Sequence, residues 1–277
     1  MRLATGRTPG RAVAALAAAL LLGACIATRG SAPSAQPSQT AATSASPTTE
    51  PTTPAATRPT TKGAARVEIN FDDEATGRGS RAFAPLLGEW VVQRDPSAPS
   101  PPNVYAQVGT EDIVPPAGDA GQLFGSAYAD YLDKIQAYQV FPSTVLVGSK
   151  VYGDVDVSVM FKPISGSVDQ AGGIIFRIVG PQNYWIWRCN VLEQDCRLWN
   201  YQDGVRTDVV EVSLPLKLGE WHKMRVVAKG DHFQLYYDDR LLAEHRDPTF
   251  PRGRVGLWTK ADSITRFDDF TVIPLGS

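Results

Sequence analysis

The chain has 277 residues, of which 43% are hydrophobic and 20% charged, with 27 basic and 29 acidic side chains. This near balance of charge excludes the concentrated basic footprint that nucleic-acid binding requires, so we expect no nucleic acid among its partners. All six tryptophans and all nine tyrosines follow residue 65. The hydrophobic core is therefore expected in the later part of the chain.

Residues 1–24 have the features of a lipoprotein signal peptide. A basic start with three arginines leads into the apolar stretch Ala12–Leu22, which is too short to span a bilayer as a mature helix. Gly23 and Ala24 then precede Cys25, an order that resembles the lipobox of bacterial lipoproteins. The resemblance implies lipidation of Cys25 and a membrane-anchored protein of the cell envelope that faces the extracytoplasmic side. The alternative is an ordinary secretory signal with an incidental cysteine.

Residues 25–65 are rich in threonine, serine, proline and alanine and have almost no large apolar side chain. Such a segment cannot bury enough surface to offset its conformational entropy, so we expect a disordered linker. At about 3.1 Å per residue for extended proline-rich chain, it would hold a domain on the order of 100 Å from the lipid surface. Either a glycosylated stalk or a plain spacer fits this composition.

Residues 66–277 contain no second linker and no internal repeat, so we expect one domain. Val155–Lys162 alternates apolar and polar residues, as a half-buried strand does. Nine further β-rich runs follow, separated by turn signals, and this spacing predicts an all-β, antiparallel sandwich or jelly roll. The nine runs are Gly173–Val179, Tyr184–Cys189, Cys196–Tyr201, Val205–Val212, Trp221–Ala228, Phe233–Tyr237, Leu241–His245, Arg254–Thr259 and Ile264–Ile273.

One short helix is expected before these strands. Its apolar positions, Tyr128, Tyr131, Leu132 and Ile135, fall at i, i+3, i+4 and i+7. We expect it to pack on an edge of the sandwich. The stretch Ser97–Gly121 is rich in proline and glycine and yields no strand assignment.

Cys189 and Cys196 flank a turn-like segment between two aromatic strands. If these strands pair antiparallel, the two cysteines can face each other, and an oxidising compartment then favours a cross-strand disulfide. A zinc site is not expected, because the sequence has no closely spaced cysteine pair and its three histidines are scattered.

That register divides the hairpin into two faces, because alternate residues share a face. The expected core face carries Trp185, Trp187, Cys189, Cys196, Leu198 and Asn200. The other face carries Tyr184, Ile186, Arg188, Arg197, Trp199 and Tyr201. Arg188 and Arg197 would lie opposite each other, which is unfavourable unless an acidic side chain or a ligand lies between them. Glu193, Asp195 and Asp203 are near in sequence.

Aromatic rings beside forked polar groups suit sugars, because a pyranose stacks on the ring while its hydroxyls form bidentate hydrogen bonds. The predicted ligand-binding residues are Gln170, Arg177, Tyr184, Arg188, Asn190, Arg197, Trp199 and Tyr201. In the alternative interpretation, the aromatic residues lie under a neighbouring loop and the two arginines form ordinary salt bridges.

The run from Val155 to Val272 resembles the bacterial laminin G-like, concanavalin A-like jelly rolls known as 3-keto-disaccharide hydrolase domains. The matching stretches are Asp154–Pro163, Asp169–Arg177, Asn183–Glu193, Gly219–Arg225, Asp247–Phe250, Gly256–Asp262 and Phe267–Phe270. The resemblance implies a sandwich with a concave sugar-binding sheet, and it leaves catalysis open because the fold does not fix the function.

The chain departs from the family pattern at several positions. The family motif reads NYYxxRxNALEDN, and in this chain Trp185 replaces the second tyrosine of that motif. Cys189 and Cys196 also depart from the pattern, and the change of two neighbouring positions to cysteine supports the disulfide. Residues 93–150 do not match the family and are expected to be an insertion.

A glycosidase needs two carboxylates, about 5–5.5 Å apart in retaining enzymes and about 6.5–9.5 Å apart in inverting ones. The ExDxxE pattern of laminarinase-type sandwiches begins at Glu193 and Asp195, but Leu198 stands at its third acid. Acids from separate strands remain candidates, namely Asp169 with Glu193 or Asp262. The sequence has no nucleophile elbow, phosphate loop or HExxH motif.

Asp72 and Asp268 lie near the two ends of the domain, where terminal strands of such sandwiches often pair, and they are weak candidates for structural Ca²⁺. Polar residues on solvated edge strands are the favoured interpretation, and no other cofactor or metal is expected. Three functions remain open. The favoured one is an envelope lipoprotein that displays a carbohydrate-binding domain, followed by a glycoside hydrolase acting on disaccharides or glycans, and then by a protein-interaction module of the envelope.

Overall fold

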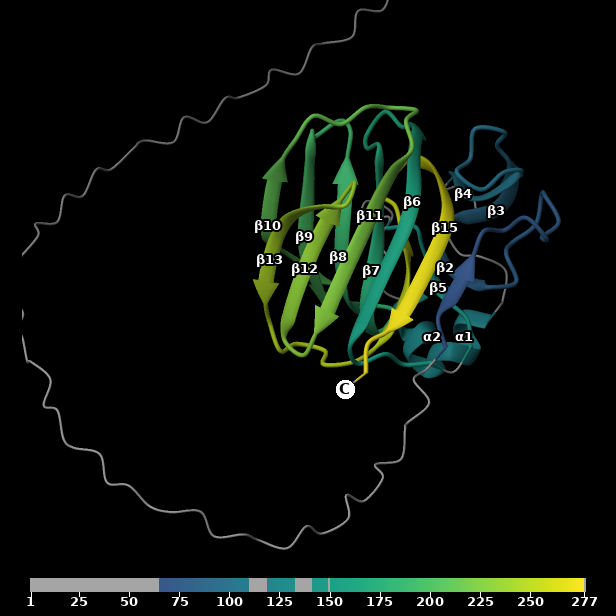
Figure 1. Ribbon diagram of the computed structural model, residues 1–277. Helices are drawn as coiled ribbons and strands as arrows, with labels where there is room; N and C mark the ends of the chain where they lie inside the picture. Colours follow the sequence, from purple (N-terminus) through teal and green to yellow (C-terminus); the bar gives the residue numbers. More distant parts are fainter. Residues whose placement is uncertain (1–64, 110–118, 133–140, 149, 277) are drawn as a thin grey trace, which may run out of the picture. The chain divides into compact units, whose positions relative to one another are not determined.

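The computed structural model describes residues 65–109, 119–132, 141–148 and 150–276, which form two β-sheets packed as layers (Figure 1). Sheet A contains β1 (Val67–Ile69), β3 (Glu89–Arg94), β4 (Asn103–Gly109), β6 (Val155–Ser165), β11 (His222–Lys229), β12 (His232–Tyr237), β13 (Arg240–Arg246) and β15 (Ile264–Pro274). Sheet B contains β2 (Phe83–Leu87), β5 (Ser143–Leu146), β7 (Ala171–Gly180), β8 (Asn183–Asn190), β9 (Asp195–Gln202), β10 (Val205–Ser213) and β14 (Arg254–Trp258).

Each strand of the two sheets pairs antiparallel with its neighbours, which confirms the predicted all-β sandwich. Sheet A has the order β13-β12-β11-β6-β15-β4-β3, with β1 also paired to β15, and sheet B has the order β10-β9-β8-β7-β14-β5-β2. The ten predicted strands correspond to β6 through β15. The five earlier strands were missed. They are short, and a proline at position 85 interrupts the pattern of β2.

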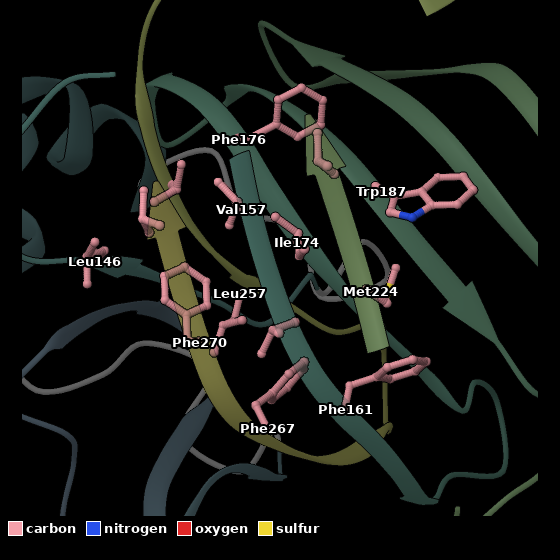
Figure 2. Close-up of a cluster of buried hydrophobic side chains, with 14 of the residues drawn as sticks. Leu146, Val157, Phe161, Ile174, Phe176, Trp187, Met224, Leu257, Phe267 and Phe270 are labelled. Atoms are coloured by element: carbon pink, nitrogen blue, oxygen red, sulfur yellow. The ribbon is translucent and has the colours of Figure 1, made fainter. Parts of the chain in front are cut away.

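The core lies between the sheets. In β6, Val155, Val157, Val159 and Phe161 are buried, whereas the residues between them are half-exposed. This alternation follows from the two-residue period of a strand and was visible in the sequence. Side chains from both sheets meet in one cluster (Figure 2). Each fully buried large apolar side chain contributes about 1.5–3 kcal/mol to folding.

A second apolar cluster lies on the outer face of sheet B. It contains Tyr184, Ile186, Trp199 and Tyr201 together with residues of α1 (Asp119–Phe124) and α2 (Ser126–Leu132). Because both faces of sheet B are covered, β7 is buried along almost its whole length, as its aliphatic residues predicted.

The predicted helix is α2, which contains Tyr128, Tyr131 and Leu132. Tyr128 donates a hydrogen bond to the carbonyl of Leu86, 3.1 Å away, and so ties α2 to sheet B. The prediction of one helix was incomplete, since α1 precedes α2. Ile135 lies outside the described residues.

The segment 93–150 is not an appendage to the sandwich, and this corrects the expectation of an insertion. Its strand β4 pairs with β3 and β15 in sheet A, and its strand β5 lies between β2 and β14 in sheet B. Apart from the pairing of β3 with β4, these pairings join residues far apart in sequence, so a local pattern rich in proline and glycine did not reveal them.

The predicted signal peptide 1–24, the lipidated Cys25 and the linker up to residue 64 lie outside the described residues. Their assignments stay predictions. Among the residues that the structure describes, no helix is both long and apolar enough to span a bilayer.

Candidate ligand-binding site

Strands β8 and β9 form the hairpin predicted from the two cysteines. In the observed register Cys189 pairs with Cys196 and Arg188 with Arg197, and the cysteines form the predicted disulfide bond. The disulfide faces the core, where it is buried with Trp187. Because side chains alternate along a strand, the residues next to each cysteine lie on the outer face of sheet B.

The aromatic residues of this outer face do not form an open stacking surface. Tyr184, Trp199 and Tyr201 are only 1%, 2% and 6% exposed. The guanidinium groups of Arg206 and Arg188 lie 3.8 Å and 4.5 Å from the centroid of the Trp199 ring. The expectation that these rings are open to a sugar was therefore wrong for this structure, although ligand binding by the hairpin stays a prediction.

The cover over the rings comes from outside the hairpin. Phe141 packs edge-on against Tyr201, with ring centroids 5.8 Å apart, and it also contacts Trp258. Trp258 in turn packs edge-on against Trp199. Phe141 lies in the segment 93–150, which was expected to be an insertion. Its contacts with Tyr201 and Trp258 were therefore not predicted.

The two opposed arginines share an acidic partner, as their predicted pairing required. Asp195 accepts from Arg188 Nη1 at 2.5 Å through Oδ1 and from Arg197 Nε at 2.7 Å through Oδ2. Arg188 Nη2 also donates to Glu193. Arg188 is fully buried, so its charge is tolerated only because these two carboxylates compensate it. Asp203, the third acid considered, takes no part in these contacts.

Lys260 extends this network. Its ammonium group lies 2.8 Å from Asp169 Oδ1 and 3.3 Å from Glu193 Oε1. Asn190 Nδ2 donates to the same Asp169 oxygen at 2.7 Å, and Asn190 Oδ1 accepts from the backbone of Gln170. We call Asp169, Arg188, Asn190, Glu193, Asp195, Arg197 and Lys260 the Arg188 cluster.

Lys260 and Arg206 were not among the predicted ligand-binding residues. Lys260 lies in the stretch Gly256–Asp262 that carries the family resemblance, so its membership of that stretch was the available signal. Arg206 lies on β10, and its place over Trp199 depends on the pairing of β10 with β9. No local pattern marked it.

Asp262 shapes the site without joining the Arg188 cluster. Its carboxylate accepts from the backbone amides of Ser167, Val168 and Asp169 at 2.6–3.1 Å. Partial burial alone would raise its pKa, but these hydrogen bonds and one from the Ser167 hydroxyl lower the pKa to about 2. Asp262 is therefore a fixed anion that holds the loop carrying Asp169, and it is a poor candidate for proton transfer.

Arg177 does not join the cluster, contrary to prediction. Its Nη2 donates to the carbonyl of Gly230 at 3.1 Å and lies 4.0 Å from Asp154. Arg177 lies on β7, whereas Arg188 lies on β8. The backbone of Arg177 is in the left-handed region, with a φ of 54°. Arg177 serves as a buried tie between strands and loops. The side chain of Gln170 likewise donates to the carbonyl of Gly166.

Glu193 is held in its ionised form. Partial burial alone would raise its pKa, but the charges of Arg188 and Lys260 outweigh that effect and lower the pKa below its usual value. Because Lys260 contacts both Asp169 and Glu193, the two contacting oxygens lie within about 6 Å of each other. An ionised Glu193 suits a base rather than a general acid.

Several polar groups of the cluster reach the surface. Glu193, Lys260 and Arg197 have side chains that are 33%, 20% and 23% exposed, above the buried Arg188 and Asp195. The hairpin thus presents a carboxylate and a guanidinium, and the loop after β14 adds the ammonium of Lys260 beside them. Such a set can both accept and donate hydrogen bonds to a polar ligand.

The weak calcium candidates are engaged in hydrogen bonds. Asp72 accepts from Asn70 Nδ2 at 2.8 Å and from the amide of Asn103 at 3.2 Å. Asp268 accepts from the amides of Ser100 and Asp269, each at 2.8 Å. Across the described ranges, no group of three or more histidine, cysteine, aspartate or glutamate side chains is arranged to hold a metal ion. A calcium site stays a prediction without structural support.

The hairpin lies within a segment that matches a known protein family. Residues 121–273 match the model of the 3-keto-alpha-glucoside-1,2-lyase-like domain. The chain belongs to this family. The match confirms the resemblance found between Val155 and Val272, extends it to α1, and includes every residue of the Arg188 cluster.

Two known proteins are similar to parts of this chain. A levanase of Bacillus subtilis (strain 168) is 25% identical over 88 residues, which are 31% of this chain and 13% of that enzyme. The chain therefore spans only a small part of the levanase. The carbohydrate binding module CBM66 from Bacillus subtilis has a TM-score of 0.51 and 16% identity, and the likeness covers 69% of this chain and 95% of the module. At this identity, the likeness establishes the shared fold alone.

Proposed function

We propose that this chain is a cell-envelope lipoprotein that displays a carbohydrate-binding β-sandwich, with the Arg188 cluster as its ligand site. The family match and the fold shared with a carbohydrate binding module support a carbohydrate-binding or glycoside-hydrolase-like domain. The sequence of the leader supports display at the envelope.

The observation that carries the proposal is the buried Arg188. A guanidinium with no exposed surface costs several kcal/mol in desolvation unless its partners are fixed around it. Here Asp195 and Glu193 bind it from one side and the Trp199 ring packs against it. The arrangement holds Glu193 in one position while leaving part of its carboxylate at the surface. Preorganised polar groups of this kind are typical of ligand sites.

A neutral sugar fits the exposed groups better than a purely anionic ligand. The cluster contains three cations, Arg188, Arg197 and Lys260, and three anions, Asp169, Glu193 and Asp195. Hydroxyl groups of a sugar can donate to the Glu193 carboxylate and accept from Lys260 at the same time. An anionic ligand would instead meet the negative charge of Glu193.

A glycan array with the full chain tests this proposal. The array should include levan, β-glucan, sucrose, trehalose and the 3-keto forms of both disaccharides. We expect binding that falls about tenfold in Lys260→Gln and Glu193→Gln, which each remove a charged hydrogen-bonding group. Lys217→Gln is the matched control, because Lys217 forms an exposed ion pair with Glu220, which is not a member of the Arg188 cluster.

Arg188→Ala is a further test of the same site, but its result needs a folding measurement because the side chain is buried. Equal binding by wild type, Lys260→Gln and Glu193→Gln would contradict the proposed site. A blank array for folded protein would contradict carbohydrate binding and favour a protein partner in the envelope.

Envelope display is tested separately. We expect cells that are fed a radiolabelled fatty acid to incorporate it into the wild-type chain and not into Cys25→Ala. The variant should also leave the membrane fraction. Equal labelling of both chains would contradict lipidation at Cys25.

A second candidate function is cleavage of a 3-keto-α-glucoside, favoured by the shared contact of Asp169 and Glu193 with Lys260. In such a substrate the ketone acidifies the neighbouring C2–H bond. An ionised carboxylate would take the C2 proton, a C1=C2 double bond would form, and the C1–O bond would break. The leaving oxygen would take a proton, and the Lys260 ammonium would stabilise the negative charge that develops on the ketone oxygen.

NMR of 3-keto-trehalose incubated with the full chain distinguishes the two candidates. Elimination predicts a vinyl proton signal and free glucose, both lost in Glu193→Gln and Asp169→Asn but retained in Lys217→Gln. Binding without any change in the sugar spectrum would contradict cleavage and leave carbohydrate binding in place.

A further inference from the structure

The outer face of sheet A carries a continuous row of side chains across six strands. The register aligns Leu241, Tyr236, Arg225, Ser158, Thr271 and Glu68 on β13, β12, β11, β6, β15 and β1. All six are partly or fully exposed, while their neighbours along each strand pack toward the core. At about 4.8 Å between strands, the row is on the order of 24 Å long.

Arg225 and Tyr236 are fixed in place within this row. Arg225 Nε and Nη2 donate to the two oxygens of Asp156 at 2.8 Å and 2.6 Å. The guanidinium lies 4.9 Å from the centroid of the Tyr236 ring, and the Tyr236 hydroxyl donates to Gln234. Among the described residues, none accepts a hydrogen bond from Arg225 Nη1, and the side chain is 33% exposed. One edge of the guanidinium therefore remains available.

The middle of the row is hollow. Ser158 and Thr271 are small, and they line a depression of about 540 Å³ together with Met160, Lys223 and Asp269. That volume lies within the roughly 300–1,000 Å³ of small-molecule sites. Arg66, Glu68, Ile69 and Asn70 of the β1 region form its other wall. The depression lies on sheet A, whereas the Arg188 cluster lies on sheet B.

We propose that this row is a second binding surface, for an uncharged linear glycan that crosses the strands of sheet A. The charges around the depression balance, since Arg66 and Lys223 are cationic while Glu68 and Asp269 are anionic, and Arg225 is neutralised by Asp156. Each wall carries one cation and one anion, so neither wall attracts a ligand of one net charge. A polyhydroxylated chain can hydrogen-bond to both.

The strand arrangement also disfavours an extended peptide. A peptide that binds by adding a strand needs a free sheet edge. β6, β11 and β15 each have neighbours on both sides, so their backbone groups are already paired. The surface offers side chains only, namely a tyrosine ring, a forked guanidinium and hydroxyl groups. These are the groups that recognise sugar rings.

The test compares oligosaccharides of two lengths, using the full chain. Neutral glucan, xylan and fructan oligomers of two and six rings are titrated by calorimetry. Ser158→Trp fills the depression, and Arg225→Ala removes the free guanidinium edge. Arg246→Ala is the matched control, because Arg246 forms an exposed ion pair with Asp231 outside the row. Thermal unfolding of each variant checks its fold.

We expect binding of a six-ring oligomer to weaken about tenfold in Ser158→Trp and in Arg225→Ala, as loss of one or two hydrogen bonds does. Arg246→Ala should keep the six-ring affinity, and Lys260→Gln should retain a six-ring binding event that Ser158→Trp removes. Hydrogen exchange should slow in β6 and β11 when the oligomer is added.

Four results would overturn the second site. One is equal six-ring affinity in wild type and folded Ser158→Trp. Another is loss of all oligomer binding in Lys260→Gln, which would assign the glycan to the Arg188 cluster alone and leave the proposed function intact. The third is protection of β6 and β11 without sugar that disappears when residues 1–64 are removed, which would make the chain's own segment the occupant. Failure of every oligomer to bind also overturns it.

Discussion

The outer faces of the two sheets each carry an arginine beside an aromatic ring, but the two arginines differ in exposure. On sheet B, Arg188 is completely buried, packed on Trp199 and bound by two carboxylates. On sheet A, Arg225 makes a similar pair with Asp156 and a similar contact with Tyr236, yet it remains one-third exposed. The same three elements, an arginine, an aspartate and an aromatic ring, thus occur under a cover on one face and in the open on the other.

The difference comes from the segment between β4 and β6. Its helices and Phe141 cover sheet B and complete a second apolar cluster there. In the part of the chain that the structure describes, the row on sheet A is flanked by the short strand β1. A charged group that is covered needs partners of opposite charge, because burying an unpaired charge is unfavourable in free energy. Whether one of these arginines is buried or exposed to a ligand therefore depends on the segment that packs over its sheet and not on the local sequence.

The largest expected effect is that of Arg188→Ala on stability. Removing the guanidinium leaves the buried Asp195 with Arg197 as its remaining partner, so we expect a loss of about 3–5 kcal/mol, as for other broken buried pairs. Urea denaturation at neutral pH measures it. A loss below about 1 kcal/mol would mean that the cover does not make the pair obligatory.

The next largest effect is a pH dependence on sheet A. Burial raises the pKa of Asp268 to about 7, with repulsion from Asp269 and Asp72 adding to the effect and hydrogen bonds from the amides of Ser100 and Asp269 opposing it. The folded state therefore binds a proton that the unfolded state releases near pH 4. The contribution of Asp268 to stability is therefore full below that pH and is lost as the pH rises through about 7, by at most about 4 kcal/mol.

Asp268→Asn should flatten this fall, because it removes the titrating group. Urea denaturation at about pH 5 and about pH 8 measures the change in each protein. Asp262 and Asp95 have lowered pKa values and lose their contributions only at lower pH, so they do not obscure the window. Equal slopes in both proteins would show that Asp268 is not the titrating group.

The disulfide should have an intermediate effect. Replacing both Cys189 and Cys196 with alanine opens a short loop, and we expect a loss of about 2–3 kcal/mol in chemical denaturation. Because the residues beside each cysteine belong to the Arg188 cluster, ligand affinity at sheet B should also fall, while affinity at the sheet A row should not. Equal losses at both faces would indicate general unfolding instead.

The smallest expected effect is that of Arg225→Ala on stability. This half-exposed pair should contribute only about 0.2–1 kcal/mol, the usual range for surface ion pairs. The same substitution should weaken six-ring glycan binding, so it separates function from stability. Destabilisation as large as that of Arg188→Ala would remove the contrast between the two faces.

Much of the fold was readable from local patterns. The alternation in β6, the two aromatic strands around the cysteines and the turn signals between later strands predicted β6 to β15. Most of these strands also form hairpins with a sequence neighbour, as β8 does with β9. Strand β5 instead lies between the distant strands β2 and β14, and β4 pairs with the distant β15 as well as with β3, so the sequence near them carried little information about the sheets.

The site was predicted in part for the same reason. The register that aligns Cys189 with Cys196 also placed Arg188 opposite Arg197, with either an acidic side chain or a ligand expected between them, and Asp195 is the acidic side chain found there. Lys260 and Asp169 come from loops that only the packed sheet brings together. Arg177 was assigned to the site by residue type alone, and its strand position takes it elsewhere.

By itself, the sequence determined the β-sandwich class, the disulfide hairpin and the family, because each rests on short-range periodicity or on a motif of contiguous residues. Only the tertiary structure decided which aromatic rings are covered, which arginines are free and which loops meet at the Arg188 cluster. Burial and ion pairing are set by contacts between distant segments, and a linear pattern cannot specify which distant segment will cover which face.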